Sequence, residues 1–107
     1  MFTIIDVARN VEGFAPAIAA RGITTVIRYY NHRNSSRLPD KALSRAELAA
    51  LTGAGLSVAI VFQQNGGAGG QISDFHNGKG DRDARCALQL AEVLGQPAGS
   101  AIYFAVD

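Results

Sequence analysis

The sequence predicts an α/β fold with strands and helices in the order β-α-β-α-β-α-β. Four short runs rich in β-branched and aromatic residues are separated by segments with helical spacing. The runs are almost continuously apolar, as in strands that are covered on both faces. Gly22 and Gly95 each follow a helical segment, where glycine commonly ends a helix. Because strands alternate with helices, the sheet is expected to be parallel with right-handed crossovers.

Two strand–helix units are predicted in the first half of the chain. Phe2–Val7 is the first strand, and apolar residues at helical spacing predict a helix near 14–21. Thr24–Tyr30 is the second strand, and the polar run Asn31–Arg37 is expected to be an exposed loop. The next helix starts at Ser44, which with Glu47 matches a capping box, in which each side chain satisfies a free backbone amide.

The second half repeats the pattern once more and adds a last strand. Leu56–Phe62 is the third strand, and Gly66–Gly70 is expected to be a flexible loop. Asp81 and Asp83 mark the start of a helix, where acidic residues are favoured. The apolar stripe of this helix is formed by Ala84, Ala87, Leu88, Ala91 and Leu94. The fourth strand is Ala101–Asp107.

Size and composition limit the possible classes of protein. The 107 residues suffice for one domain with a single core, and no linker divides residues 1–107. A net charge of +1 gives no electrostatic case for binding nucleic acid or an anionic membrane surface. Cys86 is the one cysteine, so no internal disulfide can form. No apolar stretch is long enough to span a membrane, and no signal-peptide layout is visible at the N-terminus.

Two architectures fit the strand and helix order. The pattern fits the first half of a TIM-like (β/α)₈ barrel, which takes about 250 residues, or a small open doubly wound sheet. The last residue is a carboxylate on an apolar strand. We therefore expect the chain to be the N-terminal part of a larger barrel. Half a barrel would expose apolar edges, so the remaining half or an oligomeric partner would be needed.

Asp6 and Asp107 are the candidate catalytic residues. Each ends an apolar run, and the C-terminal ends of parallel strands converge on the ligand site of such folds. Two carboxylates at that edge indicate acid/base or nucleophilic chemistry. The alternative is that a strand-end aspartate caps the following turn or helix.

Three further strand-end residues are candidates for binding substrate. Arg28 could hold a carboxylate or a sugar oxygen, and Tyr30, which shares its direction, could stack on a sugar. Gln63 could hydrogen-bond substrate hydroxyls or simply begin a solvated loop. The alternative for Arg28 is a structural pair with an acid such as Asp6. Tyr103 is assigned first to the core and second to the site.

Other sites are disfavoured. Gly66–Gly70 lacks the Gly-Lys-Ser/Thr ending of a phosphate-binding loop and does not open a helix. His32 and His76 have no recognised metal spacing around them, and Cys86 has no base near it in sequence. We therefore expect no metal and no cofactor.

Several segments together resemble a bacterial family, the Rv2525c-like (DUF1906) glycoside-hydrolase-like domains, which are related to the family 25 lysozyme-like barrels. The matching segments are Ile4-Ile5-Asp6, Val26–Tyr30, Leu43–Leu48, Ala54-Gly55-Leu56, Gly80–Ala84, Gly95-Gln96-Pro97 and Ile102–Asp107. The resemblance covers nearly the whole chain but only the N-terminal half of the family's domain. It implies a TIM-like barrel with acidic residues on strands one and four, and an extracellular or cell-envelope location. In the related lysozymes the fourth strand carries Asp-x-Glu, whose Glu is the expected acid, and this sequence ends at Asp107, before the position of that Glu.

The expected function is hydrolysis of a cell-wall-type polysaccharide such as peptidoglycan. Asp6 and Asp107 would belong to the pair of carboxyl groups that glycoside hydrolysis needs, and Arg28, Tyr30 and Gln63 would position the substrate. Two alternatives stay open. One is a glycan-binding module without catalysis, and the other is a small open-sheet domain that binds a phosphorylated small molecule.

Overall fold

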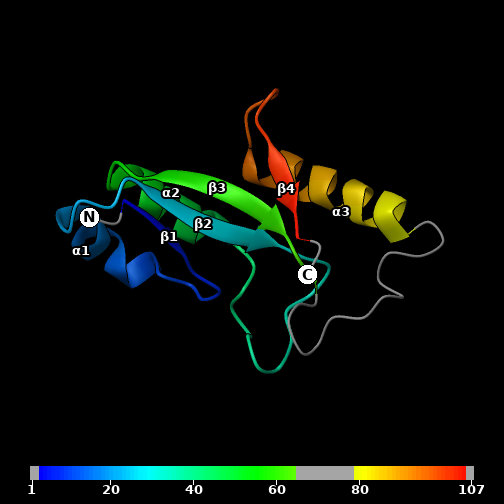
Figure 1. The fold of residues 1–107 in the computed structure, drawn as a ribbon, viewed down its shortest axis with the longest axis horizontal. Helices are drawn as coiled ribbons and strands as arrows, with labels where there is room; N and C mark the ends of the chain where they lie inside the picture. The colour runs from blue at the N-terminus through cyan, green and yellow to red at the C-terminus, as the bar shows by residue number, and fades with distance from the viewer. Residues whose placement is uncertain (1–2, 65–78, 106–107) are drawn as a thin grey trace.

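A four-stranded parallel sheet organises the molecule. The structure, a computed structural model, describes residues 3–64 and 79–105. The strands lie side by side in the order β1-β2-β3-β4 (Figure 1). They are β1 (Ile4–Asp6), β2 (Thr25–Tyr30), β3 (Ser57–Phe62) and β4 (Ile102–Phe104). The helical segments are the 3₁₀ turn η1 (Glu12–Phe14), α1 (Ala15–Ala20), α2 (Arg45–Gly53) and α3 (Lys79–Leu94). This element order confirms the predicted alternation.

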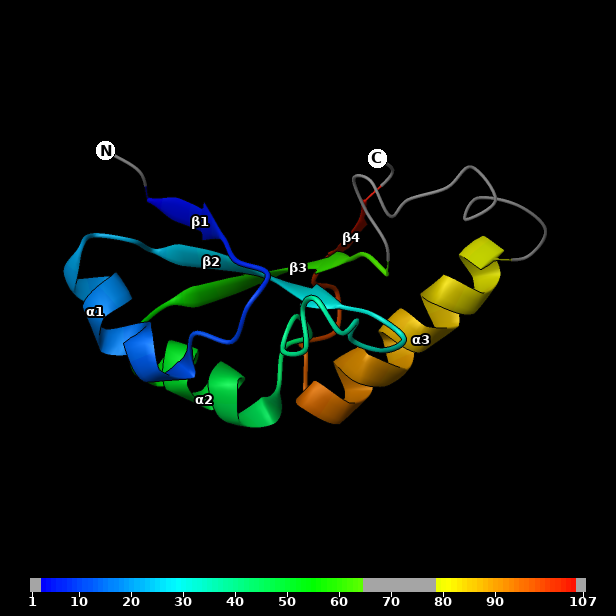
Figure 2. The same cartoon turned by 90° about the horizontal axis from the view of Figure 1, so that it is seen from below.

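The described helices all lie on one side of the sheet. Figure 2 shows α1, α2 and α3 together beneath the strands. Consecutive parallel strands joined by crossovers of one hand give this arrangement, because each helix returns over the same face. A doubly wound sheet would carry helices on both faces, which residues 3–64 and 79–105 do not show. We call the side opposite the helices the front face, because it faces the viewer in Figure 1.

Alternation along β2 decides which side chains are buried by the helices. Val26, Arg28 and Tyr30 are 0%, 0% and 2% exposed. Tyr29 lies between them in the chain and therefore points to the front face. Asp6 is paired in register with Ile27, so Asp6, Ile27 and Tyr29 lie on the same face of two adjacent strands.

The core forms between the sheet and the helices. Its buried members are Ala15, Val26, Tyr30, Leu43, Leu51, Leu56, Ile60, Phe62 and Ala87. Leu51 is the buried apolar residue of α2, and it lies one turn after Glu47 on the same side of that helix. The buried side of α2 is therefore part apolar and part charged.

The predicted capping box is formed in one direction only. Ser44 is the N-cap of α2, and its hydroxyl accepts a hydrogen bond from the Glu47 amide at 3.2 Å. The Glu47 carboxylate does not turn back to Ser44. It is fully buried and binds Arg28 instead. The start of the helix is as predicted, but the role expected for Glu47 is wrong, because the buried guanidinium offers a stronger partner than one amide.

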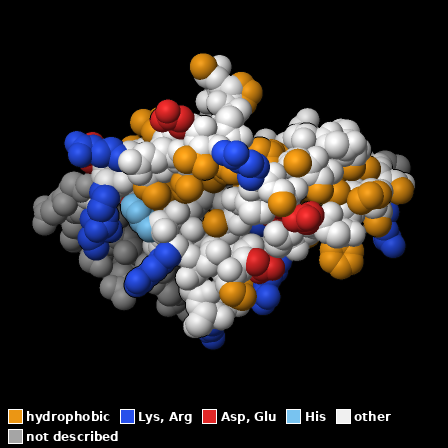
Figure 3. Space-filling model, turned by 180° about the vertical axis from the view of Figure 1, so that it is seen from behind, with side chains coloured by type: hydrophobic (Ala, Val, Ile, Leu, Met, Phe, Trp, Pro, Cys, Tyr) orange, Lys and Arg blue, Asp and Glu red, His pale blue; other side chains and the backbone are white. Residues whose placement is uncertain are grey.

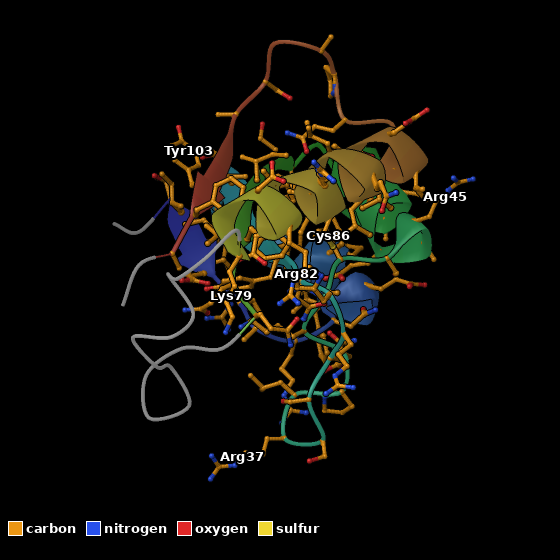
Figure 4. The ribbon with its side chains drawn as sticks, turned by 90° about the vertical axis from the view of Figure 1, so that its right-hand side faces the viewer. Arg37, Arg45, Lys79, Arg82, Cys86 and Tyr103 are labelled. Carbon is orange, nitrogen blue, oxygen red and sulfur yellow. The ribbon has the colours of Figure 1, made fainter. Side chains whose placement is uncertain are left out.

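One other sequence prediction meets a different structure. Leu88 is predicted in the apolar stripe of α3, yet it is 66% exposed, and Val93 on the same helix is 59% exposed. Figure 3, which shows the helix side, has hydrophobic side chains exposed between charged ones there. Tyr103, predicted first for the core as part of a barrel interior, is 63% exposed and points away from α3 (Figure 4). No described helix is long and apolar enough to cross a membrane.

Candidate functional site

Asp6 and Tyr29 meet at the C-terminal edge of the sheet. Asp6 is the last residue of β1, and Tyr29 is the next-to-last residue of β2. The Tyr29 hydroxyl donates a hydrogen bond to Oδ1 of Asp6 at 2.5 Å. Asp6 is exposed, whereas Tyr29 is 8% exposed. A carboxylate that is open to ligands is thus held by a side chain that is largely buried.

Lys41 and Gln63 extend this cluster across the sheet. The Lys41 ammonium lies 4.8 Å from the centre of the Tyr29 ring, within the range of a cation–π contact. The same ammonium donates to Oε1 of Gln63 at 2.9 Å. Gln63 directly follows β3, and its backbone amide donates to the Tyr30 carbonyl at 3.1 Å. Contacts therefore run from Gln63 through Lys41 and Tyr29 to Asp6, and we call these four residues the rim cluster.

The loop that carries Lys41 is attached to β2. Ala42 forms a parallel bridge with Tyr29, and the Leu43 amide donates to the Tyr29 carbonyl at 2.9 Å. Lys41 is only 6% exposed, although it lies in a loop between a strand and a helix. These backbone contacts hold the Lys41 loop against β2 next to Tyr29.

Arg28 lies behind the rim cluster, on the helix side of the sheet. Its Nε and Nη2 donate to the two carboxylate oxygens of Glu47 at 2.7 and 2.8 Å. Nη1 donates to the carbonyls of Val7 at 2.8 Å and Lys41 at 2.6 Å, and Nη2 also donates to the Asp40 carbonyl at 3.2 Å. These bonds use all five N–H groups of the guanidinium.

This geometry gives Arg28 a structural role. With every donor occupied and no exposed surface, the guanidinium has nothing left to offer a sugar oxygen. The structure therefore favours the structural alternative for Arg28, with Glu47 as its acid in place of Asp6. Glu47 also accepts from the Val11 amide at 3.0 Å, so one buried ion pair fixes the segments after β1 and before α2.

Tyr30 is buried on the helix side as well. Its hydroxyl donates to Oε1 of Gln96 at 2.8 Å, behind the sheet and away from Asp6. The tyrosine that contacts Asp6 is therefore Tyr29, not Tyr30. Alternation correctly grouped Arg28 with Tyr30, but the sequence did not tell which face of β2 the helices would cover.

Burial raises the pKa of the Tyr30 phenol above its ordinary value of 10.0. The folded state thus favours the protonated phenol, and this contribution to stability is complete below pH 10. It is lost as pH rises through the folded-state pKa, because the unfolded chain then releases its proton more readily. We expect the free energy of unfolding to fall less above pH 10 in Tyr30→Phe than in the wild type. Urea unfolding at pH 8, 9, 10 and 10.5 measures the difference, and parallel curves would contradict it.

His32 lies beside α3, the helix that carries Cys86, and neither residue belongs to the rim cluster. His32 Nε2 lies 2.6 Å from the Asp83 carboxylate, and its ring makes an edge-to-face contact with Phe62. The Cys86 thiol, labelled in Figure 4, donates to the Asn31 carbonyl at 3.6 Å. Burial raises the pKa of this thiol, and the Asp83 carboxylate raises it further, which disfavours a nucleophilic thiolate.

A cavity of about 610 Å³ opens between α2, β3 and the α3–β4 connection. Leu43, Leu48, Val58, Ile60 and Leu94 give it an apolar wall. Its lining includes no charged side chain, so it offers no carboxylate for acid/base work. Within residues 3–64 and 79–105, no group of three His, Cys, Asp or Glu side chains could hold a metal ion.

The structure thus brings together two of the five predicted site residues, Asp6 and Gln63. Arg28 and Tyr30 lie on the other face of the sheet, and Asp107 lies outside the described residues, as do Gly66–Gly70 and His76. Sequence reasoning missed Lys41 and Glu47. The sequence did contain a signal for the burial of Glu47, because it lies one helical turn before Leu51 and so shares its side of the helix. Lys41 lies in a polar loop, where no pattern marks it.

A parallel β/α sheet with an exposed carboxylate at its C-terminal edge defines an α/β protein whose candidate site lies where such folds bind their ligands. Residues 16–107 match the family model described as the Rv2525c-like, glycoside hydrolase-like domain. The chain belongs to this family.

Relatives and a solved structure agree with that assignment. The chain is 43% identical over 95 residues to uncharacterized protein YbfG and 32% identical over 93 residues to uncharacterized protein FadG, both of Bacillus subtilis (strain 168). Each match covers 87% of this chain, but only 13% and 16% of those proteins.

The solved structure is the Mycobacterium tuberculosis Tat-secreted protein Rv2525c in complex with L-tartrate. It matches with a TM-score of 0.78 and 26% identity, over 95% of this chain and 50% of that one. The chain therefore spans half the length of this structural neighbour.

Proposed function

We propose that this chain forms the N-terminal half of a TIM-like barrel that hydrolyses a cell-wall-type polysaccharide, with Asp6 as one catalytic carboxylate. The observation that carries the proposal is the exposed Asp6 carboxylate, held by Tyr29 at the C-terminal edge of the sheet. This is the edge at which (β/α)₈ enzymes place their active sites. The glycoside hydrolase-like family of the chain supports the same reaction class.

The arrangement of the sheet supports the proposed barrel. Its strands run in consecutive order, and the described helices cover one face, as in a (β/α)₈ barrel before closure. β1 and β4 are the two edges, and each pairs with one described strand. Further strands, from the same chain or from a partner, would pair with these edges and enclose the front face.

Asp107 is the proposed second acidic position. The Ala105 amide donates to the Phe62 carbonyl at 3.1 Å, so the pairing of β4 with β3 continues beyond Phe104 toward the edge where Gln63 lies. The sequence then supplies a carboxylate two residues later. Glycoside hydrolysis needs two carboxyl groups on either side of the scissile bond, and Asp6 supplies one of them.

Peptidoglycan is the proposed substrate class. The structural neighbour is described in complex with L-tartrate, a small acid rich in hydroxyl groups. Wall glycans present hydroxyl groups too, and the rim cluster offers them the Asp6 carboxylate and the Gln63 amide. Gln63 would then bind substrate while its Oε1 also accepts from the Lys41 ammonium.

The test is release of reducing ends and soluble fragments from purified peptidoglycan by the purified protein. Release supports hydrolysis. Co-sedimentation with the insoluble glycan without release would favour the second candidate, a glycan-binding module. That module would keep the fixed carboxylate of Asp6 as a hydrogen-bond acceptor and lack the second acid. If the protein neither releases fragments nor co-sediments with the glycan, both functions are rejected.

A further inference from the structure

We propose that Tyr29 is the positioning residue of the site, and that it holds the Asp6 carboxylate in its reactive orientation. This inference rests on the proposed function, because it assigns a task within that same site. The structure gives Tyr29 a contact on each side, with Asp6 at its hydroxyl and the Lys41 ammonium over its ring.

Asp6 and Tyr29 differ sharply in burial. An exposed aspartate at the end of a three-residue strand has rotamers to choose from, and solvent competes for its oxygens. Tyr29 is 8% exposed and lies in the six-residue strand β2, between β1 and β3. A short hydrogen bond from such a donor selects one orientation of the carboxylate.

The tyrosine ring is itself held in place by Lys41. The Lys41 ammonium lies over one face of the ring and donates to Gln63, which follows β3. The Lys41 backbone is fixed in turn, since its carbonyl accepts from Arg28 at 2.6 Å. Segments that follow β2 and β3 thereby determine where the hydroxyl points, and the hydroxyl determines where Asp6 points.

The contact also has a chemical consequence. Because the Tyr29 hydroxyl donates, Oδ1 of Asp6 serves as an acceptor, and Asp6 remains exposed on the front face. A carboxylate held in this way suits the member of the catalytic pair that accepts a proton or stabilises positive charge on the sugar. Small displacements of such a group are expensive in rate, since a misplacement of about 1 Å can cost about 10²-fold.

The experiment compares two variants that each lose one phenolic oxygen, Tyr29→Phe and Tyr30→Phe. The positions are adjacent in the chain but face opposite sides of the sheet, and Tyr30 bonds Gln96 instead of Asp6. We expect Tyr29→Phe to lower kcat on peptidoglycan by about 10- to 10²-fold, with KM within about twofold. Tyr30→Phe is expected to leave both constants near those of the wild type.

Crystal structures of the same proteins give a measurement that does not need turnover. In Tyr29→Phe the Asp6 carboxylate is expected to occupy another rotamer or several, whereas Tyr30→Phe should keep the orientation of the wild type. An unchanged Asp6 in Tyr29→Phe would overturn the inference, whatever the kinetics. A wild-type protein without turnover would count against the proposed function alone, and the Asp6 orientation would still decide on Tyr29.

Lys41→Met is the second variant, in case Tyr29→Phe does not fold. It removes the cation above the ring and keeps the tyrosine hydroxyl. We expect a fall in kcat of about two- to fivefold in the same direction, the size of an ordinary cation–π contribution. An Asp6 orientation and a kcat equal to those of the wild type would show that the ring needs no such support, and would contradict this arm of the inference.

Discussion

Replacing Arg28 with alanine is expected to lower the free energy of unfolding by about 3–5 kcal/mol, because the change leaves the Glu47 carboxylate buried without its partner. Glu47 is 0% exposed and binds Arg28 through both of its oxygens. Small domains have total stabilities of about 5–15 kcal/mol, so this loss alone would leave the fold marginal. Urea unfolding followed by circular dichroism measures it.

The matched control is an arginine in an exposed ion pair. Arg9 lies 3.9 Å from Asp40, with side chains that are 58% and 42% exposed, and such pairs contribute at most about 1 kcal/mol. Arg9→Ala should therefore unfold close to the wild type. Equal losses in Arg9→Ala and Arg28→Ala would contradict the structural role of the buried pair.

A double variant separates the charge from the other bonds of the arginine. Arg28→Met with Glu47→Leu removes both charges, which often restores stability when the replacements pack well. Here the recovery should be partial, because Arg28 also binds the carbonyls of Val7, Asp40 and Lys41. Each buried carbonyl left without a donor costs about 1–3 kcal/mol. Full recovery would show that these carbonyls find other partners.

Much of the fold could be predicted because it depends on local patterns. The C-terminal ends of β2 and β3, the Ser44 cap and the glycine that ends α1 follow from side-chain period, capping chemistry and backbone freedom at single positions. Gly22, for example, has φ 85°, a conformation that other residues adopt at a cost. The one-sided arrangement of helices was less accessible, since the order of strands across the sheet is a property of the whole chain.

The candidate site was harder to predict for the same reason. Asp6 was found because strand ends converge in parallel sheets, a rule that needs no coordinates. To choose between Tyr29 and Tyr30, one must know which face of β2 the helices cover. The almost continuously apolar sequence of β2 does not distinguish its two faces. Lys41 reaches the cluster because Ala42 bridges to Tyr29, a contact between residues 13 positions apart that no local pattern records.

The second large effect is expected at Asp6. Asp6→Asn should lower kcat on peptidoglycan by about 10²–10⁴-fold, the range that a proton-transferring or charge-stabilising carboxyl group contributes. Asparagine keeps a side-chain oxygen that can accept from Tyr29, so the geometry of the rim cluster should survive the change. The loss of kcat would then report the missing charge. An unfolding curve of Asp6→Asn that matches that of the wild type would confirm the intact fold.

Asp81→Asn is the matched control, since it removes a carboxylate of an exposed pair on α3, 3.0 Å from Arg85, where no catalytic role is proposed. It should keep the kcat of the wild type. Asp107→Asn should lose turnover as Asp6→Asn does if the two carboxylates act on one bond, and equal release of reducing sugar by Asp107→Asn and the wild type would remove Asp107 from the pair.

Aryl glycosides with good leaving groups separate the two possible tasks of Asp6. Such leaving groups need no proton, so loss of the general acid is largely masked on these substrates, whereas loss of a nucleophile, base or charge stabiliser is not. Because Oδ1 of Asp6 accepts from Tyr29, we expect the Asp6→Asn defect to persist on them. Recovery of wild-type rates with good leaving groups would instead make Asp6 the proton donor, and Tyr29 would then hold the acid of the pair.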